Sequence, residues 1–180
     1  TLFRSPGGVS SASDSETSGW TTVFSGPATT NSYSDTVAIP FAFDFFGMPV
    51  DYLKAAPNGI LTFDTMATAL PNLDEPLPST NLPDMAIAAW WDDFATPNSG
   101  DIIRWKVFGT APNRQLWVKW HSMEVGTATF AYFMVVLEET SNNIYLVDGW
   151  SSGASGPARV GLQLDANTFV IADNSTSLSN

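Results

Sequence analysis

The sequence contains no cysteine among its 180 residues. This absence excludes disulfides, thiolate metal sites and cysteine nucleophiles, but it leaves the compartment open. Histidine is nearly as scarce, so any Ser-His-Asp triad or histidine metal site would have to be built around His121. We therefore do not expect an enzyme that works through histidine or cysteine.

Basic residues are also few. Seven Lys and Arg stand against eighteen Asp and Glu, which gives a net charge of -11. Such a chain repels phosphate backbones and anionic lipid surfaces, so neither nucleic acid nor membrane insertion is expected. Surplus carboxylates on a Ser/Thr-rich chain are common in extracellular modules. The charge therefore favours a secreted or cell-surface location.

Long apolar runs and helical periodicity are missing as well. No stretch approaches the ~18 apolar residues of a membrane span, and no long segment places apolar residues at i, i+3, i+4 and i+7. The first five residues lack the charged and apolar regions of a signal peptide. We expect any export signal to have been removed.

What is present is an apolar and aromatic chain: 44% of the residues are hydrophobic, 13% are aromatic and only 14% are charged. This composition is typical of a folded protein, and the length is close to that of one domain. We expect residues 1–36 to form a Ser/Thr/Gly-rich arm or linker with one short strand at 20–24. Residues 37–173 then form the domain, and residues 174–180 a polar tail.

Period-two hydrophobicity is the strongest local signal. Residues 37–45 alternate apolar and more exposed positions, which predicts a strand with one buried face. Pro40 cannot donate to a ladder, so this strand is expected at an edge. Four prolines between Asp64 and Asp84 predict a surface crossover. Further strands are predicted at 52–55, 60–63, 85–91, 102–108, 116–125, 129–138, 144–147, 160–164 and 169–171.

These strands are short and are separated by Gly, Pro, Asn and Asp. Such punctuation at near-regular intervals is typical of a sandwich or barrel. The expected fold is an all-β, antiparallel two-sheet β-sandwich, jelly-roll-like, with about ten strands.

Five blocks occur in order along the chain: IPFAFDFFG at 39–47, PNGILTF at 57–63, AIAAWWDD at 86–93, GTAPNR at 109–114 and VGLQ at 160–163. Together they resemble a β-sandwich module that recurs in secreted and cell-surface multidomain bacterial proteins, over about residues 37–171. The resemblance implies a two-sheet sandwich that lies beside adhesin, sorting and repeat domains. It implies no catalytic site.

The strongest polar cluster is Asp92 and Asp93, followed by Asp101 across a short loop. Carboxylate oxygens of this number could hold Ca²⁺, which takes six to eight oxygen ligands. Alternatively, the same side chains accept backbone N–H bonds in turns where the buried strand ends. No other cofactor is expected.

Two tryptophans, Trp117 and Trp150, are candidates for binding glycans. Trp117 shares a strand face with Lys119, His121 and Met123, which predicts a half-exposed position. Trp150 lies in a Gly/Ser-rich segment that predicts a loop. The paired carboxylates Glu138 and Glu139 point to opposite faces of a strand, which is unsuited to shared catalysis.

The N-terminal arm is a candidate for assembly, because its apolar residues Leu2, Phe3 and Val9 could add as a strand to another copy. An ordinary interdomain linker has the same composition. We expect a non-catalytic extracellular module for adhesion, binding or structural assembly at the bacterial surface. Its partners would be other copies of itself, neighbouring domains or glycans. The alternatives are a filament subunit that donates its N-terminal strand, and a carbohydrate-binding module.

Overall fold

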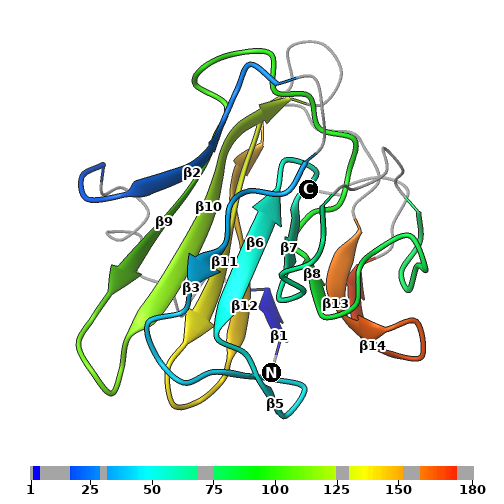
Figure 1. Ribbon diagram of the computed structural model, residues 1–180. Coiled ribbons are helices and arrows are strands. Elements are labelled where there is room, and N and C mark those ends of the chain that lie inside the picture. Colours follow the sequence, from blue (N-terminus) through cyan, green and yellow to red (C-terminus); the bar gives the residue numbers. More distant parts are fainter. Residues whose placement is uncertain are drawn as a thin grey trace.

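The computed structural model describes residues 2–4, 17–28, 32–68, 75–124, 130–151 and 159–173. Within these ranges the chain forms fourteen strands and no helix. Two six-stranded sheets pack face to face, and a two-stranded ribbon lies at one end (Figure 1). The predicted β-sandwich is confirmed. No segment in the described ranges is a helix of the length and apolarity that a membrane crossing needs.

The first sheet contains a meander of four consecutive strands flanked by two strands from the N-terminal region. Its spatial order is β1 (Leu2–Arg4), β12 (Ile144–Ser151), β11 (Phe130–Glu138), β10 (Gln115–Glu124), β9 (Ile102–Phe108) and β2 (Thr21–Ser25). The pairs are antiparallel except β1 with β12, which is parallel. The strand expected in the N-terminal arm is β2, and it forms one edge of this sheet.

The second sheet contains a three-stranded meander and a C-terminal hairpin. Its order is β14 (Thr168–Asp173), β13 (Val160–Asp165), β8 (Ala86–Ala88), β7 (Ile60–Thr62), β6 (Tyr52–Ala56) and β3 (Val37–Ala38). The separate ribbon pairs β4 (Asp44–Phe45) with β5 (Met48–Pro49). Consecutive strands lie side by side within each sheet, and crossovers between the sheets place β2 beside β9 and β13 beside β8.

The segment 37–45 shows how far a period-two pattern determines structure. Every second side chain from Val37 to Phe45 is buried, as the alternation predicts. Only the two ends of the segment are paired as strands, in β3 and β4. Between them, Ile39 N–H donates to Asp51 O at 2.8 Å, whereas Pro40 has no N–H to donate. As expected, β3 lies at an end of its sheet.

The main core fills the space between the two sheets and is rich in aromatic rings. Trp120 stacks on Phe133 with ring centroids 5.1 Å apart and an interplanar angle of 15°. Its Nε1–H donates to the carbonyl of Ala56 in the opposite sheet at 2.8 Å. This bond satisfies a buried donor and fixes the two sheets relative to each other.

Both sheets also carry apolar clusters on their outer faces. On the first sheet, Trp117, Met134 and Val136 are buried beneath Trp20, Phe108, Tyr145 and Val147. On the second sheet, Leu77 and Leu82 of the proline-rich crossover pack over β6, β7 and β8. Gln163 holds this crossover in place, because its side chain accepts from Ser79 N–H and donates to Ser79 O, both at 2.9 Å.

A β-bulge changes the phase of β10. The register with β11 shifts between Trp120 and Met123, and Ser122 has a φ of 64°. The bulge returns Met123 to the main core beside Trp120. The prediction that Met123 shares a face with His121 and Trp117 is therefore wrong, because alternation holds only while the register is unbroken.

Candidate functional site: an apolar cleft at the open side of the sandwich

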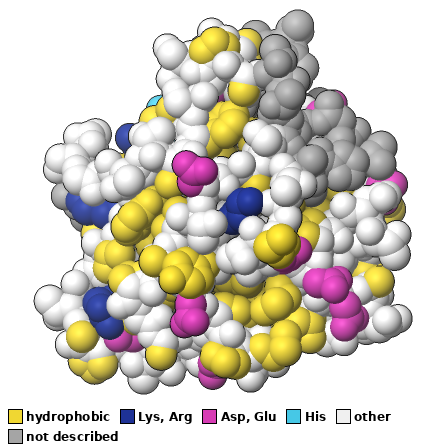
Figure 2. All heavy atoms as spheres, in the orientation of Figure 1, with side chains coloured by type: hydrophobic (Ala, Val, Ile, Leu, Met, Phe, Trp, Pro, Cys, Tyr) yellow, Lys and Arg dark blue, Asp and Glu magenta, His cyan; other side chains and the backbone are white. Residues whose placement is uncertain are grey.

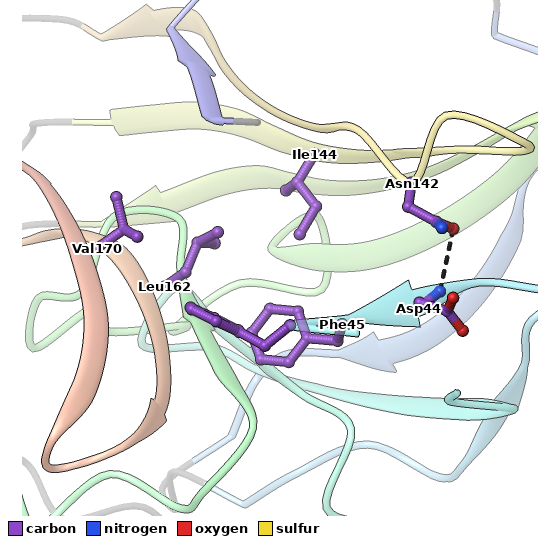
Figure 3. A pocket seen from close by; sticks show the side chains of 7 residues that line it. Asp44, Phe45, Asn142, Ile144, Leu162 and Val170 are labelled. Carbon is purple, nitrogen blue, oxygen red and sulfur yellow. Dashed lines mark hydrogen bonds between the residues drawn. The ribbon is translucent and has the colours of Figure 1, made fainter. Parts of the chain in front are cut away.

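A cleft of about 190 Å³ lies between the β4–β5 ribbon, the β11–β12 turn with the start of β12, and the β13–β14 hairpin (Figure 3). Four separate segments line it, with Asp44, Phe45, Phe46, Asn142, Ile144, Leu162 and Val170. The lining is mainly apolar, and its polar groups come from Asp44 and Asn142. Such a composition suits an apolar side chain held beside a few hydrogen-bonding groups.

The β4–β5 hairpin forms one wall of the cleft. Its two turn residues, Phe46 and Gly47, have φ values of 51° and 79°, the geometry of a type I′ turn. That turn favours Asn or Asp before Gly, because a bulky side chain is strained at positive φ. Phe46 nevertheless occupies the position, is 38% exposed and packs edge-on against Phe45 at 4.9 Å.

A neighbouring turn holds this hairpin in place. Asp44 N–H donates to Asn142 Oδ1 at 3.0 Å, a contact between residues far apart in the sequence. Figure 3 shows the bond at one end of the cleft. Asn142 lies in the β11–β12 turn with a φ of 53°, a conformation that Asn tolerates better than most residues. The ribbon is therefore tied to the edge of the first sheet.

Five exposed apolar side chains lie on the ribbon and on β14, the two elements that contribute Phe46 and Val170 to the cleft. Phe46 and Met48 are 38% and 40% exposed, and Phe169, Val170 and Ile171 of β14 are between 38% and 44% exposed. We call these five residues the edge patch. Figure 2 shows hydrophobic side chains over the lower part of this face, in the region of the ribbon and the β13–β14 hairpin. Clustered apolar exposure of this kind marks interaction surfaces more often than scattered residues do.

Glu138 belongs to the same turn but has a structural role. It accepts hydrogen bonds from Ser141 Oγ at 2.6 Å, Gln115 Nε2 at 3.1 Å and Tyr145 Oη at 3.1 Å. Burial alone would raise the pKa of Glu138, but its hydrogen bonds from Ser141, Gln115, Asn143 and Tyr145 outweigh burial and lower it. The carboxylate is kept ionised as an acceptor.

Glu139 forms a bidentate pair with Arg114, at 2.8 Å from Nε to Oε2 and 2.6 Å from Nη2 to Oε1. These hydrogen bonds lower the pKa of Glu139. Arg114 also lies over the ring of Phe41, 5.4 Å from its centroid. The two neighbouring carboxylates therefore have separate hydrogen-bond partners.

The structure does not gather the predicted Ca²⁺ ligands Asp92, Asp93 and Asp101 into a cluster of three carboxylates. Among the described residues, no three His, Asp or Glu side chains lie close enough together to hold an ion. Asp92 Oδ1 accepts from Asp93 N–H at 2.8 Å, and Asp101 Oδ2 accepts from Asn98 N–H at 2.7 Å. These are the turn contacts that the alternative interpretation predicted.

The structure places Trp117 differently from the prediction. It is fully buried, and its Nε1–H donates to Gln115 Oε1 at 3.1 Å. The alternation identified its face correctly, but that face is covered by an outer cluster, so Trp117 cannot stack on a sugar. Half-buried His121 lies on the same sheet with its ring against Tyr132 at 4.8 Å.

Trp150 lies in β12, opposite Tyr132, and not in a loop. Its side chain falls outside the part of the chain that the structure describes, and so does Val9. Leu2 and Phe3 belong to β1, where their backbones lie opposite Ile144 and Tyr145. Two of the residues predicted for assembly, Leu2 and Phe3, therefore lie in a strand next to Ile144, which lines the cleft.

Sequence reasoning missed the cleft itself. Its residues come from positions 44–46, 142–144, 162 and 170, so no local pattern joins them. One signal was available: Phe46-Gly47 within IPFAFDFFG is a hairpin turn in which an aromatic residue stands where Asn or Asp is usual. A strained and exposed aromatic residue is a reason to suspect a surface role.

No curated protein and no solved structure matches the chain. A model described as NIDO related matches residues 10–180. The match spans nearly the whole chain and extends over most of the N-terminal arm as well as both sheets. The protein therefore belongs to the NIDO-related family.

Proposed function

We propose that this chain is a non-catalytic module for adhesion, binding or structural assembly at a bacterial surface, and that it acts through the edge patch. The observation that carries this proposal is Phe46, which is held at positive φ and exposed at the rim of the cleft. Backbone strain of this kind costs about 1–3 kcal/mol. An asparagine would remove most of that cost but would lose the contact with Phe45; the exposure of the ring supports a surface role as well.

The carboxylates considered for catalysis also support the proposal. Glu138 and Glu139 accept several fixed hydrogen bonds each. A general acid or base must be able to exchange its proton with a substrate. Groups committed to turns and ion pairs are poorly suited to that task.

The test measures adhesion and stability on the same variant. Fluorescent beads coated with the protein are mixed either with peptidoglycan sacculi or with beads that carry the same protein. We expect the coated beads to associate with at least one of these surfaces. Phe46→Asn should weaken the association several-fold without lowering the melting temperature, because the lost Phe45 contact is offset by relief of strain.

Met66→Asn is the matched control, because Met66 is 81% exposed and lies outside the edge patch. It should leave adhesion unchanged. Association with neither surface, or equal adhesion by Phe46→Asn and wild type, contradicts the proposal. Product release from a panel of glycan, ester and peptide substrates would contradict the non-catalytic assignment.

A second candidate is a filament subunit that exchanges its N-terminal strand between copies. The observation that favours it is β1, a three-residue strand paired in parallel with β12 at a sheet edge. So short a strand makes few ladder bonds, and parallel pairing is slightly less stable per residue than antiparallel pairing. Exchange of an identical element is a low-cost route to assembly.

An engineered disulfide tests this candidate in a chain that has no cysteine of its own. Phe3 and Tyr145 are register partners, so Phe3→Cys combined with Tyr145→Cys reports where β1 is bound. Exchange predicts covalent dimers and longer species under mild oxidation. Oxidation to covalent monomers alone contradicts exchange. Phe3→Cys by itself is the control for random cross-linking.

A further inference from the structure

The outer edge of β14 differs from the other sheet edges of the molecule. In the described part of the chain no strand pairs with it, and every residue of β14 except Asp173 is exposed. Its central residues, Phe169, Val170 and Ile171, are all apolar. Natural edge strands are usually protected by Lys, Pro or inward charges. Here no such residue interrupts the three positions.

Other edges offer less to a partner. The β3 strand is two residues long and is followed closely by Pro40. The β1 strand is three residues long, and β2 consists largely of Ser and Thr. The β14 edge is therefore the most favourable place on the sandwich for another strand to add.

The backbone of β14 shows which N–H and C=O groups are available to pair with another strand. The Val170 carbonyl lies against β13, since a Cβ on Gly161 would be 2.6 Å from that oxygen. The amide and carbonyl of one residue point to the same side of a strand, and those of its neighbours point to the other. Phe169 and Ile171 therefore present their N–H and C=O groups to the free edge.

We propose that a second copy of the chain pairs with this edge, β14 against β14 and antiparallel, to give a twofold dimer. The available hydrogen-bonding groups place Phe169 opposite Ile171 of the second copy, and the reverse. Val170 then lies opposite its own symmetry mate. Aromatic and β-branched residues are favourable cross-strand partners, and a self-complementary patch is what a twofold interface requires.

Charge agrees with this register. If the same register continues beyond the three central residues, Asp173 of one copy lies opposite Asn167 of the other. No two carboxylates of β14 then face each other directly. The remaining charge is unfavourable at long range, because each copy carries a net charge of -11. Screening by salt weakens that repulsion. Dimerisation is therefore expected to strengthen as the NaCl concentration rises.

Register shifts on both sides of the central residues limit the contact. The β13–β14 register shifts between Gln163 and Asp165 and again between Val160 and Gly161, so the regular stretch is confined to residues 169–171. Bulges twist an edge away from continued pairing. The contact thus suits one discrete partner strand rather than an extended sheet. The dimer shares Phe169, Val170 and Ile171 with the edge patch, but it is tested on the free protein in solution, whereas the proposed adhesion is tested with coated beads and the Phe46 variant.

Sedimentation equilibrium over a concentration series tests the dimer. Wild type should dimerise reversibly, and Phe169→Lys should weaken the dimer at least about tenfold through lost cross-strand pairing. Tyr52→Lys is the matched control, because Tyr52 is 49% exposed on another strand and the charge change is the same. It should leave the dimer intact. Circular dichroism confirms that each variant is folded.

A cysteine tests the register itself. Val170 lies opposite its symmetry mate at a non-hydrogen-bonded position, where Cα atoms are about 4.5 Å apart, a distance that a disulfide can span. Val170→Cys should therefore oxidise to a covalent dimer much faster than Tyr52→Cys. A monomer at all concentrations, a dimer unaffected by Phe169→Lys, or equal cross-linking of the two cysteine variants would overturn the proposal.

Discussion

Two hairpin turns in this molecule each contain a glycine at nearly the same φ, but the two glycines have opposite surroundings. Gly59, between β6 and β7, has a φ of 77°, and Gly47, between β4 and β5, has a φ of 79°. A Cβ on Gly59 would lie 1.8 Å from the Trp90 carbonyl oxygen, whereas a Cβ on Gly47 would meet nothing within 4 Å. The first turn is packed into the protein, and the second projects from it.

The residue before each glycine shows the same contrast. Asn58 is completely buried, whereas Phe46 is 38% exposed. Residue types alone would suggest the reverse arrangement, with the polar side chain in water and the aromatic one inside. The difference teaches that packing within the protein dictates the buried turn, whereas packing places no such constraint on the exposed one.

The largest expected effect is a loss of stability when the buried turn, at Gly59, is changed. Gly59→Ala should cost more than about 4 kcal/mol or prevent folding, because the new methyl group meets a backbone oxygen that cannot move aside. Gly47→Ala should cost only about 1–2 kcal/mol, the penalty for an L-residue in the left-handed region. Urea unfolding of both variants measures the difference. Equal losses at the two positions would show that packing does not distinguish the turns.

A smaller effect concerns the bond that fixes the projecting turn. Asn142→Gly keeps the positive φ but removes the acceptor for Asp44 N–H, which should cost about 1–2 kcal/mol. Faster amide exchange is expected at Asp44, with little change at Gly59. Asn142→Asp retains an acceptor oxygen and should retain protection at Asp44. Unchanged exchange in Asn142→Gly would mean that the bond does not hold the hairpin.

The smallest effect depends on pH. The Arg114 side chain lowers the pKa of Glu139, so this pair stabilises the fold above the ordinary pKa of a glutamate. The stabilisation is lost as the pH falls through the lowered value. Glu139→Gln should therefore be less stable than wild type near neutral pH, and the difference should shrink below about pH 4. Guanidinium unfolding across this range measures it, and a constant difference would contradict the linkage.

Much of the fold could be predicted from the sequence because period-two patterns report burial directly. The predicted strand at 102–108 matches β9, and the alternation over 37–45 identified each buried side chain. The pattern could not show that residues 39–43 lack strand pairing, since pairing depends on which strands lie alongside. It also could not reveal the bulge that returns Met123 to the core.

The site was less predictable because its determinants are non-local. Alternation shows which face of β10 carries Trp117, but not that Trp20 and Phe108 cover that face. The acidic pattern at Asp92 fits both ion binding and turn formation, and only the observed hydrogen bonds separate these readings. The cleft is assembled from distant segments, so it becomes visible only when both sheets are in place.

The order of strands in the second sheet has a consequence for a chain that is made or threaded with its N-terminus first. The four strands β9–β12 can pair with one another as soon as they have been made, since each pairs with its sequence neighbour. The inner strand β8 must wait for β13, which pairs with its Ala86–Ala88 segment from much later in the chain. Until residues 160–165 arrive, β8 is an open apolar edge, so a product cut short before them should aggregate.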